Sequence, residues 1–139
     1  MTLANIGDQV VIRAKTTNSR IGESGYPNAA YNKFVMTGKI AASDSVMYLL
    51  KNDGDLDAIS AGYCFFYLFD NCSSLTTPPE LPATTLATHC YQGIFDDCSS
   101  LTTSPELPAT TLATFCYAGM FNRCSSLTSA PALPATTLA

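Results

Sequence analysis

Apolar positions in the second half of the chain recur at helical spacing. They follow steps of four, one, three, one and three residues, with polar residues between them. The positions are Leu86, Cys90, Tyr91, Ile94, Phe95 and Cys98, and again Leu112, Cys116, Tyr117, Met120, Phe121 and Cys124. A proline and threonines come before each set, as in the first turn and cap of a helix. The pattern predicts one amphipathic helix in each unit, and a first, imperfect helix over residues 58–72.

A short extended segment, residues 75–82 in the first unit, separates these predicted helices. Pro79 and its equivalents Pro105 and Pro131 interrupt any long strand, because proline has no N–H to donate to a sheet. Leu75, Pro79 and Leu81 share one parity, which we assign to the interior. The other parity varies between units and predicts an exposed binding face. That candidate face consists of Thr76, Pro78, Glu80, Thr102, Ser104, Glu106, Thr128, Ala130 and Ala132.

Both patterns belong to a 26-residue unit that is written three times, starting at Cys64, Cys90 and Cys116. A fixed period of this length is typical of solenoids, in which each unit buries its apolar face only against its neighbours. The predicted fold class is α/β, a leucine-rich-repeat-like solenoid with a short strand and a helix per repeat. We expect the solenoid over residues 61–139. The third copy has no polar capping unit after it, which favours either a fragment or an end that stacks on another chain.

Residues 1–60 lack the repeat and predict a small β-rich N-terminal cap domain. Residues 7–15 contain a β-branched run and resemble a strand, whereas residues 16–32 are rich in turn formers and predict a long loop. Residues 33–50 predict a hairpin, although a buried strand and a short helix are hard to tell apart over residues 46–50. Residues 51–54 predict a further turn.

The repeat pattern FxxCSSLTxxPxLPATTLAxxCYxxMF resembles the leucine-rich repeats of BspA-like surface proteins of Bacteroidetes type. The resemblance covers residues 58–139, and the segment TGKIAASDSVMYLL is similar to the region that often precedes such repeats. It departs from the family in its period, which is nearer 23 residues there. The resemblance implies a secreted or cell-surface adhesion module, or a related protein carried by phages, and it implies no catalysis.

Composition excludes several functions. The net charge is −4 and only seven residues are Lys or Arg, so the chain lacks the basic stripe of a nucleic-acid binder. No apolar run is long enough for a membrane span, and the N-terminus does not resemble a signal peptide. We therefore expect no nucleic acid and no membrane insertion. An extracellular or cell-surface location would require a leader that this chain lacks, and a phage particle is the alternative.

Six cysteines form two columns, Cys64/Cys90/Cys116 and Cys72/Cys98/Cys124. A buried ladder of free thiols is favoured over disulfides, because free cysteine packs as a small apolar residue. The spacing of eight residues within each copy matches no zinc motif, so we expect no metal.

Other reactive groups have simpler interpretations. The acidic residues over 52–57 suggest a calcium loop but lack its glycine and glutamate, which favours a solvated turn. The single histidine, His89, takes a position that Phe115 fills in the next copy, and no serine-nucleophile motif is present. Glu80 and Glu106 could imitate a glycosidase pair, but nothing is expected to shield them from water.

The sequence thus predicts a non-enzymatic binding or adhesion module without a cofactor. Its partner would be a protein or glycan that contacts the candidate face. A structural assembly subunit, which associates end to end through its third copy, remains the alternative.

Overall fold

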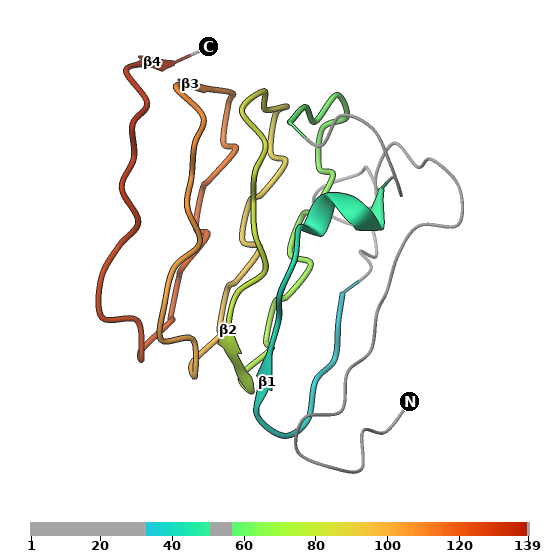
Figure 1. Ribbon diagram of the computed structural model, residues 1–139, viewed down its shortest axis with the longest axis vertical. Coiled ribbons are helices and arrows are strands. Elements are labelled where there is room, and N and C mark those ends of the chain that lie inside the picture. The colour runs from blue at the N-terminus through green and yellow to red at the C-terminus, as the bar shows by residue number, and fades with distance from the viewer. Residues whose placement is uncertain (1–32, 51–56, 139) are drawn as a thin grey trace.

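The computed structural model describes residues 33–50 and 57–138. The chain passes through long, flattened loops that lie side by side in sequence order, and the C-terminal copy forms one end of the row (Figure 1). The regular elements are short: β1 (Ile40–Ala41), the 3-10 helix η1 (Val46–Leu49), β2 (Leu75–Thr77), β3 (Thr111–Leu112) and β4 (Thr137–Leu138). Strand β1 pairs with β2, and β3 pairs with β4, both in parallel.

The predicted fold class is wrong. The described residues contain no α-helix, and their strands of two or three residues form only two small parallel sheets. The molecule is therefore not a leucine-rich-repeat-like solenoid with a helix and a strand in each repeat. The stretches that were expected to be helices are instead runs of consecutive turns over residues 62–71, 88–97 and 114–123, here called the turn segments.

Left-handed backbone conformations prevent an α-helix in the turn segments. In the middle segment φ is +57° at His89, +60° at Gly93 and +56° at Asp97, one positive value every four residues. The other two segments show the same spacing. A right-handed helix cannot pass through a residue of positive φ, so each fourth residue starts a new turn.

Hydrogen bonds in the turn segments alternate between two directions. Even-numbered residues donate backward within their own turn, as Ile94 N–H does to Tyr91 O at 3.2 Å. Odd-numbered residues donate to the next copy, as Tyr91 N–H does to Cys116 O at 3.0 Å. Each backbone N–H of residues 89–98 in the second copy is thereby satisfied without a helix or a regular sheet, as buried backbone requires.

The turns also explain the misleading periodicity. Buried side chains come in neighbouring pairs four residues apart, first Cys90 with Tyr91, then Ile94 with Phe95, and finally Cys98. A period of four residues can be distinguished from the helical period of 3.6 residues only over stretches longer than these ten-residue segments. Helical spacing alone therefore could not separate the two structures.

Equivalent side chains of successive copies stack on one another and form the core. The rings of Phe65 and Tyr91 have centroids 5.5 Å apart, and those of Tyr91 and Tyr117 are 6.1 Å apart. A second column joins Phe69 to Phe95 at 5.7 Å and Phe95 onward to its equivalent in the third copy at 5.8 Å. Offset stacks of this kind add to the free energy of apolar burial.

The segment before the first copy stacks in the same way, although it lacks the repeat sequence. Phe34 N–H donates to Leu68 O at 2.9 Å, and the Phe34 ring stacks on Phe69 with centroids 5.1 Å apart. Isolated bridges continue the contact, from Ser45 to Glu80 and from Ala58 to Thr85. Part of the region assigned to a separate cap thus forms an additional layer against the first copy.

The hairpin predicted for residues 33–50 is also wrong. β1 pairs in parallel with β2 rather than with its own neighbour, and Val46–Leu49 forms η1. Ser45 caps η1, because its Oγ accepts a hydrogen bond of 3.1 Å from Met47 N–H. The strand predicted over residues 7–15, the loop over 16–32 and the turn over 51–54 lie outside the described residues, as does the calcium-loop candidate apart from Asp57.

Candidate functional site

The nine residues of the candidate face all have solvent contact. Glu80, Thr102, Glu106, Thr128, Ala130 and Ala132 are exposed, and Thr76, Pro78 and Ser104 are half-buried. The opposite parity is buried at Leu75, Pro79, Leu81, Leu101, Pro105 and Leu107. The assignment of Leu75, Pro79 and Leu81 to the interior is therefore confirmed, and it holds for their equivalents in the second copy, although Thr77 and Thr103 have the same parity and are exposed. In the third copy Leu133 departs from it, being 54% exposed.

Threonines of the candidate face also hold the copies together. Thr76 Oγ1 donates to Ile40 O at 3.0 Å, and Thr102 Oγ1 donates to Thr76 O at 3.1 Å. The backbone N–H of Thr102 reaches the same Thr76 carbonyl at 3.2 Å. These hydroxyls point along the stacking direction, so only part of their hydrogen-bonding capacity remains for a ligand.

The two glutamates of the face occupy equivalent positions in adjacent copies. Glu80 and Glu106 are both exposed, and only the backbone of Glu80 is engaged, donating to Asp44 O at 2.8 Å. A glycosidase keeps one carboxylic acid in a shielded environment so that it remains protonated. No such shielding exists here, and the carboxylates form a solvated acidic row.

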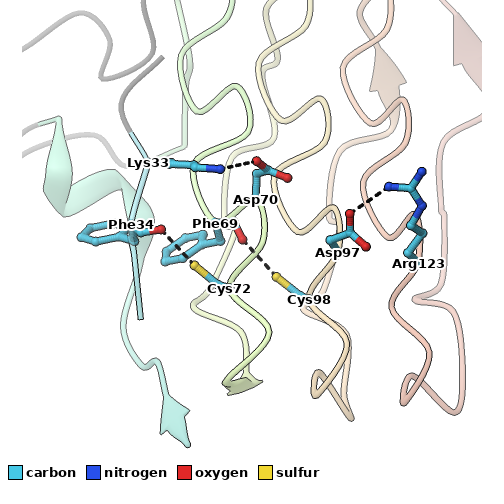
Figure 2. Close-up of polar contacts among 8 residues, drawn as sticks. All are labelled: Lys33, Phe34, Phe69, Asp70, Cys72, Asp97, Cys98 and Arg123. Atoms are coloured by element: carbon cyan, nitrogen blue, oxygen red, sulfur yellow. Dashed lines mark hydrogen bonds and ion pairs between the residues drawn. The ribbon is translucent and has the colours of Figure 1, made fainter. Parts of the chain in front are cut away.

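The six cysteines are buried and carry free thiols, as the ladder interpretation predicted. In the second column each thiol donates to a carbonyl of the layer before it (Figure 2). Cys72 Sγ donates to Phe34 O at 3.2 Å, and Cys98 Sγ donates to Phe69 O at 3.1 Å. Cys124 repeats the contact at 3.1 Å, to the carbonyl of the equivalent phenylalanine in the second copy.

Burial makes these thiols poor nucleophiles. Desolvation raises the pKa of Cys72 to about 11 and that of Cys90 to about 12, and it raises the pKa of Cys98 further still. Because the thiolate is the form that attacks electrophiles and binds metals, neutral pH leaves these groups unreactive. The described residues also contain no group of three or more His, Cys, Asp or Glu side chains placed to hold a metal ion.

His89 lies inside a column of rings. Its imidazole stacks between Tyr63, with centroids 4.5 Å apart, and Phe115, with centroids 5.0 Å apart. Its Nδ1 also forms a short hydrogen bond with the Gln92 side chain. The position agrees with its replacement by phenylalanine in the next copy, and the ring acts as a packing element.

A row of polar contacts beside the turn segments was missed by the sequence analysis. Lys33 Nζ lies 2.7 Å from Asp70 Oδ2, and Arg123 Nη1 lies 2.8 Å from Asp97 Oδ2 (Figure 2). The second pair could have been found, because Asp97 and Arg123 are equivalent residues of neighbouring copies with opposite charge. The Asp97–Arg123 pair is exposed and contributes little to stability but favours the correct register, whereas Asp70 of the first pair is buried.

Comparisons with known proteins found no relative. No family model matches the sequence, and neither a curated protein nor a solved structure matches it significantly. The resemblance to BspA-like repeats therefore stays a prediction. Within the described part of the chain, no helix is long and apolar enough to cross a membrane.

Proposed function

We propose that the protein is a non-enzymatic binding module whose candidate face contacts a protein or glycan at a cell surface. The observation that carries the proposal is the repetition of exposed polar groups at one position in adjacent copies. Glu80 and Glu106 recur in this way, as do Thr102 and Thr128.

The spacing of these groups is set by the stacked core. Ring centroids of equivalent residues lie 5.5–6.1 Å apart across the copies, so the outward side chains form rows with a similar repeat. A rigid row of carboxylates and hydroxyls suits an extended polymer that offers donors at regular intervals. An extended polypeptide or a glycan chain has that character.

The buried position of other reactive groups also supports a binding role. The six thiols have raised pKa values or are inaccessible, and His89 lies between two rings. The rows offer accessible polar groups that would bind through many weak contacts rather than through one reactive residue.

The proposal is tested by measuring binding of the protein to glycan and peptide arrays and to fixed cells. In a variant that combines Ser104→Arg with Glu106→Arg, we expect at least tenfold weaker binding to any ligand that is found. The matched control is Thr114→Arg, which places the same side chain at an exposed position of a turn segment and should bind normally. Equal loss in both variants, or normal binding by the double variant, would contradict the assignment of this face.

A further inference from the structure

Among the residues that the structure describes, none covers the side of the third copy that faces away from the second copy. This end face comprises Phe115, Tyr117, Phe121, Leu127 and Leu133, which are exposed or half-buried. Three of the equivalent positions in the second copy, Tyr91, Phe95 and Leu101, have no exposed surface, and Leu107 is 6% exposed. The third copy is what covers them, so the end face repeats an interface that the molecule already makes.

The end face also carries a row of free backbone donors. In the second copy five alternate N–H groups, at residues 89, 91, 93, 95 and 97, donate to the third copy at 2.9–3.1 Å. Their equivalents are Phe115, Tyr117, Gly119, Phe121 and Arg123. None of these five N–H groups has an acceptor among residues 33–50 and 57–138.

The donors all point in one direction along the row of copies. Two end faces that met along this row would oppose donor to donor, which leaves the N–H groups unpaired. The complementary surface must instead present carbonyl groups at alternate residues and an apolar pair at every fourth residue. A turn segment has both properties on the side that faces the preceding copy. In the third copy, the carbonyl groups of residues 114, 116, 118, 120 and 122 accept hydrogen bonds from the second copy in this way.

We infer that the end face is a docking surface for a further copy of the same 26-residue unit. The incoming unit would accept the five hydrogen bonds with the carbonyls of its even positions and stack its rings on Phe115, Tyr117 and Phe121. Continuity with the interface between the second and third copies identifies this occupant. The inference does not depend on the proposed ligand face, which lies on the extended segments.

Hydrogen exchange followed by NMR tests the inference on the full chain. The probe is a synthetic peptide with the sequence of residues 110–138, the stretch that covers the second copy. We expect saturating peptide to slow exchange at least tenfold at the amides of Phe115, Tyr117, Gly119, Phe121 and Arg123. The amides of Cys116, Ala118 and Met120, which are already bonded within their own turns, should change little.

Two variants and a scrambled peptide serve as controls. Phe115→Asp places a charge on the end face at a position where aspartate tolerates positive φ, so it should abolish the protection. Val35→Asp changes a residue that is 86% exposed in the leading layer and should leave the protection intact. Glu106→Arg should also leave it intact, which separates this result from the test of the proposed function.

Two results would overturn the inference. The first is unchanged exchange at millimolar peptide, and the second is equal protection by the scrambled peptide.

Discussion

The hydroxyl of Tyr91 offers the sharpest test of the stacked core. The Tyr91 side chain is fully buried between Phe65 and Tyr117, and its oxygen has no hydrogen-bond partner among the described residues. The equivalent position in the first copy is Phe65, which is equally buried. Tyr91→Phe therefore removes an unpaired polar atom and leaves a ring that the column already accepts.

The expected gain follows from the cost of a buried, unpaired polar group, about 1–3 kcal/mol. Loss of the oxygen also removes some packing contacts, so we expect the free energy of unfolding to rise by about 1 kcal/mol. For a chain of 139 residues this corresponds to an increase in Tm of roughly 3 °C.

Urea unfolding followed by circular dichroism measures this change. Tyr117→Phe is the matched control, because Tyr117 is only half-buried and its change should stay within about 0.5 kcal/mol. A Tyr91→Phe protein that is less stable than the wild type would refute the reasoning, since it would show that the hydroxyl is bonded in the folded protein.

Two further predictions concern the turns and the thiols. Gly93→Ala should lower the free energy of unfolding in urea by about 2–4 kcal/mol, because a Cβ at residue 93 would lie 2.5 Å from the Tyr67 ring and φ is +60°. Gly119→Ala, where φ is also positive but no atom lies near the new Cβ, should lower it by only about 1–2 kcal/mol. Equal losses in the two variants would disprove the clash with Tyr67. The thiols should react with a disulfide reagent at pH 8 only after unfolding, and fast labelling of the native protein would contradict their burial. Below pH 8 both states keep the thiols protonated, so they give no pH dependence. As the pH rises past 9, the thiols of the unfolded state ionise, whereas Cys72 and Cys90 of the folded state, with pKa values of about 11 and 12, stay protonated. The free energy of unfolding should therefore fall across that range. Cys90→Ala should reduce this fall, and an unchanged dependence on pH would count against the raised pKa of Cys90.

Sequence patterns predicted which side chains are buried better than they predicted the backbone. The inward assignment of Leu75, Pro79 and Leu81, and the ladder of free cysteines, depended on repetition of residue types between copies. Repetition reports packing directly, because stacked positions must match in volume.

The backbone prediction failed because a helix and a run of four-residue turns bury nearly the same positions over ten residues. A signal was present, since Asn71, Gly93, Asp97 and Gly119 all tolerate positive φ and stand at positions of the four-residue turns. It was weakened by Tyr63, Tyr67 and Phe115, which also have positive φ although their residue types do not favour that conformation. The additional layer at Phe34 could not be recognised, since it shares the stacking and not the sequence.

The register between copies restricts how such a protein can change length during evolution. In the first two turn segments, every odd-numbered N–H donates to a carbonyl 25 residues further along the chain, so a deletion of one residue inside a unit would misplace the contacts of that unit. Unequal recombination between repeated gene segments would be tolerated only in whole multiples of 26 codons. A smaller difference in length is nevertheless present before the first copy. The pairing offset falls from 35 residues at Ser45 to 27 at Ala58, so the chain has eight more residues between these two bridges than it has between their partners Glu80 and Thr85. The parallel pairing on both sides of this stretch is kept despite the extra length.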